Sequence, residues 1–236
     1  MSLCFLVEGD RTEKRMYRAW VGHVFPSLTH VLTIGEITSS SYCVISGGGI
    51  PLYKEELRDA LSDIRQNAQV RHLFLCIDAE ELSREERRRE MEDEIRKAEI
   101  ESRVRTGNPW LAIHPIVQNC CVETWFLGHA KMMRRNPSSE LLREFKAFYD
   151  VSERDPERMA AYRGFRTRAE FHLHYLKEML REQNPMLSYT KKRPDAVLGA
   201  DYLRALRHRC VATGHLASLQ ELFDTWESIA PHAASP

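Results

Sequence analysis

The sequence predicts an α/β protein: a small parallel sheet flanked by helices, followed by an α-helical C-terminal region. Up to about residue 118, short apolar runs alternate with helical patterns, which is typical of strands joined by crossover helices. The run HLFLCI at residues 72–77 is continuously apolar, as expected for a strand covered on both faces. From about residue 122 onward only helical patterns occur, and prolines separate them.

Five strands are expected along the first half of the chain. The run SLCFLV predicts a buried first strand. The run at residues 110–118 contains Pro115, which cannot donate to a β-ladder, so it indicates an edge strand. The predicted strands cover residues 2–7, 30–34, 42–46, 72–77 and 110–118.

Apolar residues recur at helical spacing between these strands. Helices are predicted over 10–25 and 52–68. A third, over 83–105, carries many charges of both signs beside a thin apolar stripe. This pattern is typical of a solvated surface helix, and docking of a partner protein is the alternative. The expected domains are an α/β domain at residues 1–130 and a helical C-terminal region at residues 131–236.

Composition favours a globular protein. The chain has 236 residues, of which 43% are apolar and 29% charged. Its formal net charge is zero, so any contact with nucleic acid would depend on local basic patches. We expect a cytoplasmic protein, because no apolar run approaches the ~18 residues of a membrane span. Its six cysteines lack Cys-x-x-Cys and zinc-finger spacing, which favours reduced, buried thiols.

Acidic residues follow two of the predicted strands directly. Glu8 comes after the run at residues 2–7, and Asp78 and Glu80 come after the run at 72–77. Ligands of open parallel sheets bind outside the carboxyl ends of the strands. If the two strands are neighbours, three carboxylates converge there, and a divalent cation would offset their repulsion. Oxygen ligands alone suit Mg²⁺ or Mn²⁺.

A structural role is the alternative for each single acid. An acid after a strand is commonly a helix cap or a turn residue. Asp10 and Glu13 are assigned to that role, as the two ends of a capping box. Gly9 would permit close approach of a phosphate.

Cysteine and histidine residues are also interpreted as structural. Cys120 and Cys121 are expected to begin a buried helix. His172 and His174 lie two positions apart on a predicted helix, so they point away from each other and are not expected to share a metal.

The acidic positions resemble those of a known family. Glu8-Gly9-x-x-Thr12-Glu13-x-x-x-Tyr17 after a strand, with Asp78-x-Glu80 after another, resembles the Toprim fold, and more narrowly its RloB-like branch, related to OLD-type nucleases. The segment QNCCVETWFLGH is similar to that branch's Asn-Pro-Cys-x-Glu-x-Trp-x-Leu-x-x-His segment, in which Glu123 is the next acidic position. The resemblance covers about residues 3–130.

The resemblance implies a metal-dependent nuclease that hydrolyses phosphodiester bonds in DNA or RNA, in antiphage or restriction-linked defence. It implies that Glu8 acts as general acid or base or as a metal ligand. Asp78 and Glu80 would hold Mg²⁺ or Mn²⁺, and Glu123 would complete the metal shell or a second site. An ATPase partner protein is expected from the resemblance alone, and self-association into a homo-oligomer stays open.

Two departures and one weaker match accompany this resemblance. Glu80 replaces the usual second aspartate and is longer by one methylene. Cys120 replaces the expected proline, which should alter only the turn. The segment YTKK resembles a basic segment of the family, so a nucleic-acid contact is expected there. In this contact Tyr189 would stack on a base, and the phosphates would be contacted by Lys191, Lys192 and Arg193.

Two other functions remain open from the residues. A non-catalytic sensor or partner-binding subunit would keep the fold without the metal, and the charged helix at 83–105 favours it. A phosphotransfer enzyme acting on small nucleotides would use the same carboxylates. Zero net charge mildly favours a small ligand or a nucleic-acid surface supplied by a partner.

Overall fold

The computed structural model describes residues 1–229, and the chain divides into two compact units. Within the described residues, the first comprises 1–77, 85–117 and 225–229, and the second comprises 78–84 and 118–224. The division lies at residues 117/118 rather than at the expected 130, and the end of the last helix returns to the first unit.

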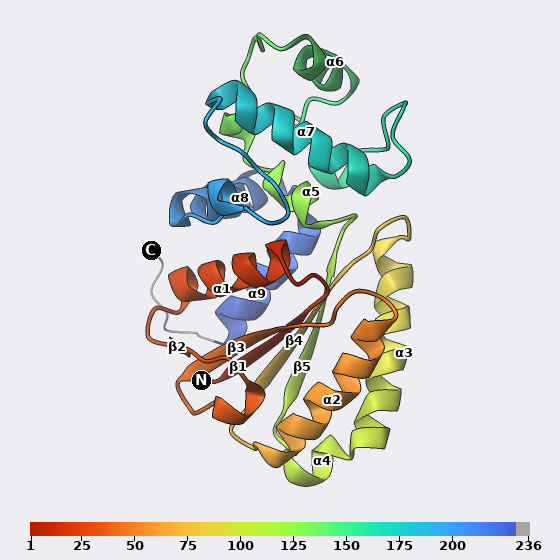
Figure 1. Cartoon of the computed structure of the whole chain (residues 1–236), viewed down its shortest axis with the longest axis vertical. Coiled ribbons are helices and arrows are strands. Elements are labelled where there is room, and N and C mark those ends of the chain that lie inside the picture. Colours follow the sequence, from red (N-terminus) through yellow and green to blue (C-terminus); the bar gives the residue numbers. More distant parts are fainter. Residues whose placement is uncertain (230–236) are drawn as a thin grey trace. The chain divides into compact units, whose positions relative to one another are not determined.

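A five-stranded parallel sheet forms the centre of the first unit, in the order β2-β3-β1-β4-β5 (Figure 1). The central strand β1 pairs with β3 on one side and β4 on the other, with Val7 opposite Ser46 and Cys76. The strands are β1 (Leu3–Val7), β2 (Thr29–His30), β3 (Ser41–Ser46), β4 (His72–Asp78) and β5 (Ala112–Gln118).

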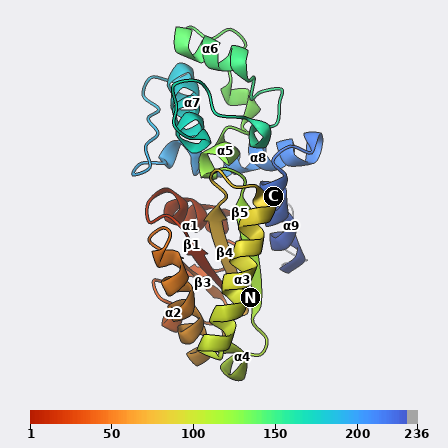
Figure 2. The ribbon, with the colours of Figure 1, turned by 90° about the vertical axis from the view of Figure 1, so that its right-hand side faces the viewer.

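Helices cover both faces of this sheet (Figures 1 and 2). Phe5 of β1 stacks on Phe74 at 4.5 Å between ring centroids and contacts Tyr17 of α1 and Trp226 of α9. The opposite face is covered by α2 and α3, which lie side by side. The helices beginning in this unit or at its boundary are α1 (Thr12–Val24), η1 (Ile34–Glu36), α2 (Leu52–Gln66), α3 (Arg84–Ser102) and α4 (Val104–Gly107).

The charged helix α3 is tied to its own unit by ion pairs. Glu94 pairs with Lys54 of α2 at 3.3 Å and with Lys97 at 3.0 Å, and Glu101 pairs with Arg58 of α2 at 2.7 Å. The buried stripe of Met91, Ile95 and Ala98 packs inward. These contacts match the surface-helix interpretation.

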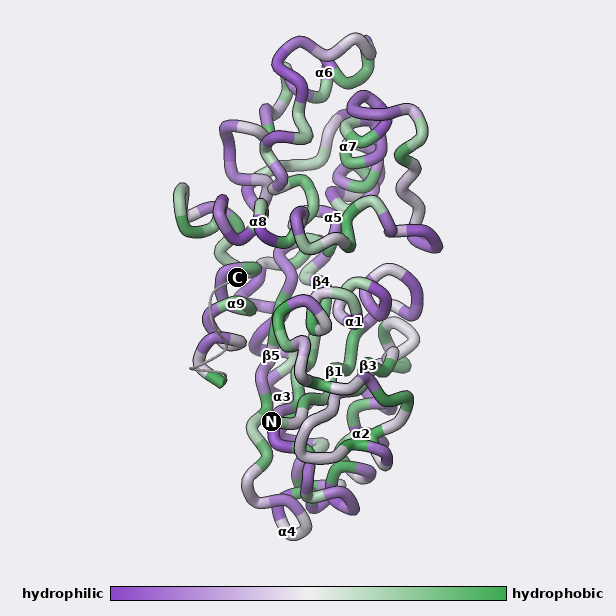
Figure 3. The backbone as a smooth tube through the Cα atoms, turned by 90° about the vertical axis from the view of Figure 1, so that its left-hand side faces the viewer, coloured by the Kyte–Doolittle hydropathy of each residue, from purple (hydrophilic) through white to green (hydrophobic). Residues whose placement is uncertain are grey.

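The second unit is helical in the part of the chain that the structure describes. An aromatic cluster forms much of its core, with Phe145 of α6 packed edge-on against Phe171 of α7 at 5.1 Å between centroids. In Figure 3 the coil of α7 alternates between hydrophobic and hydrophilic colour, as expected of an amphipathic helix. The helices are α5 (Val122–Phe126), η2 (Ala130–Met132), α6 (Glu140–Phe148), η3 (Pro156–Arg158), α7 (Arg168–Gln183), η4 (Asp195–Val197), α8 (Ala200–Thr213) and α9 (Ala217–Ile229).

The predicted fold class is confirmed: a parallel sheet flanked by helices, with an α-helical C-terminal region. β5 lies at the sheet edge, as Pro115 predicted. The strand expected at 30–34 is wrong in most of its length, because β2 ends at His30 and Ile34 begins a 3₁₀ turn. Among the described residues, every helix is too short or too polar to cross a membrane.

Candidate functional site

Glu8 is fixed in place by backbone hydrogen bonds on both sides of β1. Its N–H donates to the carbonyl of Cys76 in β4 at 3.1 Å, and its own carbonyl accepts from Gly49 at 3.0 Å. The Gly49 amide can reach this carbonyl because Gly48 and Gly49 adopt φ of +70° and +82°, which glycine permits at low cost. The half-buried Glu8 side chain therefore starts from a rigid backbone.

Gly9 and Glu13 form a tight turn immediately after Glu8. The Gly9 N–H donates to Oε2 of Glu13 at 2.5 Å, and a Cβ added at Gly9 would collide with that oxygen. Glu13 and Thr12 are buried at the start of α1. The expected capping box is wrong, because Arg11 occupies the N-cap position without a side-chain hydrogen bond. Asp10 instead pairs with Lys14 at 3.7 Å on the surface.

Asp78 and Glu80 lie where β4 turns into the second unit. Asp78 is the last residue of β4 and is half-buried. The N–H of Ala79 donates to Gln118 at 2.9 Å, and the N–H of Glu80 donates to Cys120 at 2.8 Å, so the pairing with β5 continues past the strand end. Glu80 adopts a left-handed conformation with φ of +53°, and its side chain is exposed.

Arg168 holds this turn from α7. Its guanidinium donates to the carbonyls of Glu80 and Leu82, and it pairs with Glu81 at 3.6 Å. The carboxylate of Glu81 is thus matched by an arginine, whereas Arg168 contacts Glu80 through the main chain.

Glu123 lies in α5 and is 2% exposed. Its Oε1 accepts a hydrogen bond of 2.9 Å from the phenol of Tyr189. Burial of a carboxylate is expensive unless it is hydrogen-bonded, and this phenol offsets part of that cost. The bond ties α5 to the loop before η4, a contact that the sequence did not indicate.

The basic segment of this loop fits its predicted role only in part. Lys191, Lys192 and Arg193 are exposed, around a bridge in which Thr190 and Arg193 exchange backbone hydrogen bonds. Tyr189 is 3% exposed and packs against Phe126. The structure does not support base stacking on Tyr189, because a buried ring presents no free face.

A cluster of two cysteines and a histidine lies beside Glu123 in the second unit. One potential ligand atom from each of Cys120, Cys121 and His172 lies within 4.8 Å of the other two, and all three residues are buried. Among the described residues, this is the only group of three or more possible metal ligands that lie so close together. It contains no carboxylate.

The sequence did not indicate this cluster. Cys120 and Cys121 were visible only as neighbouring thiols, and His172 comes from α7, far along the chain. His172 is buried while His174 is exposed, so the two side chains face different sides of α7, as their spacing predicted.

The two thiols affect each other's protonation. A hydrogen bond with Cys121, and then a hydrogen bond with His172, lower the pKa of Cys120, against the opposing effect of burial. The hydrogen bond with Cys120, and then burial, raise the pKa of Cys121. The negative charges of Glu123 and Asp78 raise it further. Asp78 and Glu123 thus act electrostatically on one thiol of the same unit.

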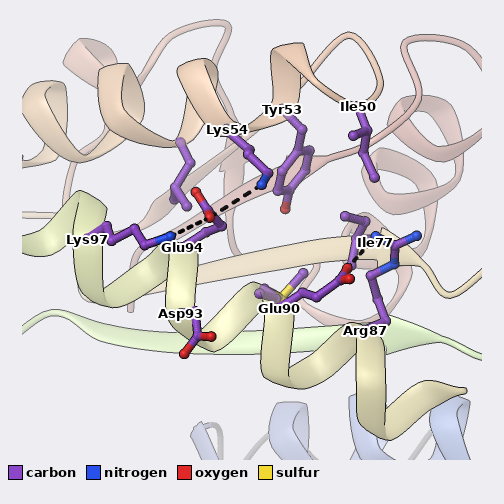
Figure 4. A pocket seen from close by; sticks show the side chains of 11 residues that line it. Ile50, Tyr53, Lys54, Ile77, Arg87, Glu90, Asp93, Glu94 and Lys97 are labelled. Carbon is purple, nitrogen blue, oxygen red and sulfur yellow. Dashed lines mark hydrogen bonds and ion pairs between the residues drawn. The ribbon is translucent and has the colours of Figure 1, made fainter. Parts of the chain in front are cut away.

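A pocket of about 290 Å³ lies between α2 and α3 in the first unit. Figure 4 shows Glu94 paired with Lys54 and Lys97, and Glu90 paired with Arg87. Asp93 also lines the pocket and pairs with Arg96 of α3. Ile77 and Met91 supply apolar lining. Because its charges already neutralise one another, this pocket shows no preference for a charged ligand.

Comparison with protein-family models, curated proteins and solved structures finds no match for this chain.

Proposed function

We propose that this protein is a metal-dependent nuclease that hydrolyses phosphodiester bonds in DNA or RNA. The carboxylates at the carboxyl ends of β1 and β4, on Glu8, Asp78 and Glu80, would form its reaction centre, with Glu123 as a further acidic group. A role in antiphage or restriction-linked defence rests on the Toprim and RloB-like resemblance and belongs to the same proposal.

The observation that carries the proposal is the pairing of β1 with β4. These strands are parallel neighbours in the middle of the sheet. Glu8 is the residue after β1, and Asp78 is the last residue of β4. The carboxyl ends of central parallel strands are where ligands of open α/β sheets bind. Two acids at such ends support a cation-dependent site better than either acid would alone.

The donor set fits Mg²⁺ or Mn²⁺ in chemistry. Carboxylate oxygens are hard ligands, and Mg²⁺ keeps several waters while binding one or two carboxylates together with substrate phosphates. Asp78, Glu80 and Glu123 do not form a three-ligand cage by themselves. A Mg²⁺ site of this kind does not require such a cage. When bound, the cation would neutralise developing phosphoryl charge and lower the pKa of a bound water.

The protein's own side chains would transfer protons and bind the substrate phosphates. Glu8, on its doubly hydrogen-bonded backbone, would accept the proton of the attacking water or return one to the leaving oxygen. Lys191, Lys192 and Arg193 would contact phosphates of the strand, because they are exposed cations on one short loop.

The test is cleavage of labelled DNA, RNA and tRNA, and of nucleoside triphosphates, with and without Mn²⁺. The wild type is compared with Glu8→Gln and with Glu81→Gln, a control that removes a nearby acid already paired with Arg168. We expect Mn²⁺-dependent cleavage of polymeric nucleic acid that falls by roughly 10²–10⁴-fold in Glu8→Gln only.

Three outcomes would overturn the proposal. Equal cleavage by Glu8→Gln would remove the assigned role of that residue. Turnover of nucleoside triphosphates alone would favour the phosphotransfer alternative. Metal binding without any cleavage would favour the non-catalytic subunit.

A further inference from the structure

Two adjacent cysteines and a distant histidine meet inside the second unit. Cys120 and Cys121 lie between the end of β5 and the start of α5, and His172 lies in the first half of α7. A sulfur from each cysteine and a ring nitrogen of the histidine lie within 4.8 Å of one another. Their exposed fractions are 0%, 2% and 0%, so the cluster is shielded from water.

The backbone at this junction brings both sulfurs to the same side. Adjacent residues of an extended strand direct their side chains to opposite faces. Cys120 instead has φ of +65°, in the left-handed region, while Cys121 is extended with φ of −154°. The amide of Glu80, which is itself left-handed, donates to the Cys120 carbonyl and holds this bend.

The hydrogen bonds of His172 define its neutral form. Nε2 lies 3.3 Å from the carbonyl oxygen of Met159, which can only accept, so Nε2 carries the proton. Nδ1 then presents a lone pair, and the hydroxyl of Thr124 donates to it at 2.7 Å. A histidine that donates one ring N–H to a carbonyl and turns the other nitrogen inward has the arrangement found in metal ligands.

Thr124 stands at the centre of this arrangement. Its Oγ1 accepts from the Cys121 N–H at 3.4 Å and lies 3.6 Å from the Cys121 sulfur. Zn²⁺ bound to Nδ1 at about 2.1 Å would lie where Oγ1 of Thr124 now sits, so the Thr124 side chain would have to rotate away from Nδ1. The change needed at the site is therefore a new χ1 rotamer of Thr124.

We propose that Cys120, Cys121 and His172 form a binding site for Zn²⁺, in addition to the carboxylates at the sheet edge. Two thiolates and one imidazole are soft and borderline ligands that suit Zn²⁺ and not Mg²⁺. Two thiolates balance its double charge, which permits burial. Three protein ligands leave a fourth position for a water or another ligand. The inference does not rest on the proposed nuclease function.

Metal at this position would join the β5–α5 junction to α7. The ligands come from residues 120–121 and 172, so binding would close a loop of about fifty residues within the second unit. Zn²⁺ binds the folded arrangement and stabilises it by mass action. Removal of the metal should therefore lower the Tm of the protein.

The test is Zn²⁺ and Co²⁺ binding to full-length, chelator-treated, reduced protein. Co²⁺ bound through thiolates gives a near-ultraviolet charge-transfer band, which reports the ligands of the wild type without any substitution. Cys120→Ala and His172→Gln each remove one ligand. Cys210→Ala is the matched control, because Cys210 is another buried thiol of the same unit, in α8, and bonds only weakly to Leu216. Circular dichroism establishes that each variant is folded.

We expect one equivalent of Zn²⁺, a thiolate-to-cobalt band, and a raised Tm in the wild type and in Cys210→Ala. Affinity should fall by roughly tenfold or more in Cys120→Ala and His172→Gln. Absence of the cobalt band in the wild type would overturn the proposal, and so would equal Zn²⁺ affinity in folded Cys120→Ala or His172→Gln. Cleavage activity enters neither readout, so failure here leaves the proposed function untouched.

Discussion

The amide of Glu8 donates a 3.1 Å hydrogen bond to the carbonyl of Cys76, two residues before Asp78. This bond continues the β1–β4 ladder by one residue beyond Val7. It fixes the backbone from which the Glu8 carboxylate leaves the sheet. The proposed chemistry depends on this register, because a shift of one residue would turn Glu8 to the other face.

Gly9 should not tolerate a side chain. Gly9→Ala places a Cβ against Oε2 of Glu13, which accepts the Gly9 N–H, so this buried carboxylate must shift and its hydrogen bond to Gly9 weakens. We expect a loss of about 1–3 kcal/mol in the free energy of unfolding, measured by urea denaturation. Gly35→Ala is the control, because a Cβ there meets no atom within 4 Å. Equal stability of both variants would contradict this account of the turn.

Tyr189→Phe should destabilise the protein through Glu123. The substitution removes the phenol that donates to Oε1 of this buried carboxylate. Losing a hydrogen bond to a buried charged group costs about 1–3 kcal/mol. Chemical denaturation measures the change, with Tyr162→Phe as control, since that phenol bonds the exposed Glu144 at 3.4 Å. A Tyr189→Phe variant as stable as Tyr162→Phe would show that the bond contributes little.

Acid should destabilise the first unit through His72. Burial and then the charge of His114, whose Nε2 lies 3.1 Å from Nδ1 of His72, lower the pKa of His72 from 6.5 to about 4. Between these pH values the unfolded state binds the proton and the folded state does not. Stability is therefore full above pH 6.5 and falls as the pH drops toward 4.

His72→Gln checks this pH dependence. The variant lacks the titrating ring, so the slope of unfolding free energy against pH between 6.5 and 4 should be shallower than in the wild type. Urea unfolding across this range measures both slopes. Parallel slopes would assign the acid sensitivity to other groups.

The sequence was sufficient for the fold class, because strand burial and helix amphipathicity are local patterns. Continuous apolar runs predicted β1 and β4, and Pro115 predicted the edge position of β5. The failure at residues 30–34 has a local cause: Glu36 accepts from the amides of Leu32 and Thr33, which favours a 3₁₀ turn over a strand.

The candidate site was less predictable, because its contacts join distant residues. Strand-end positions for Glu8 and Asp78 followed from the apolar runs before them. The bond between Tyr189 and Glu123 spans 66 positions, and His172 reaches Thr124 across 48. No periodicity encodes such contacts. A tyrosine beside basic residues therefore predicted base stacking, whereas packing against Phe126 buries that ring.

The central claim is that carboxylates after β1 and β4 hold a divalent cation, and calorimetric titration with Mn²⁺ tests it most directly. Wild type, Glu8→Gln, Asp78→Asn and the control Glu81→Gln are each loaded with one equivalent of Zn²⁺, which fills the thiol cluster, and excess metal is removed before the Mn²⁺ titration. The account predicts Mn²⁺ binding to wild type and Glu81→Gln, and affinity weakened by roughly tenfold or more in Glu8→Gln and Asp78→Asn. Equal affinity in all four proteins, or no Mn²⁺ binding to the wild type, would contradict it.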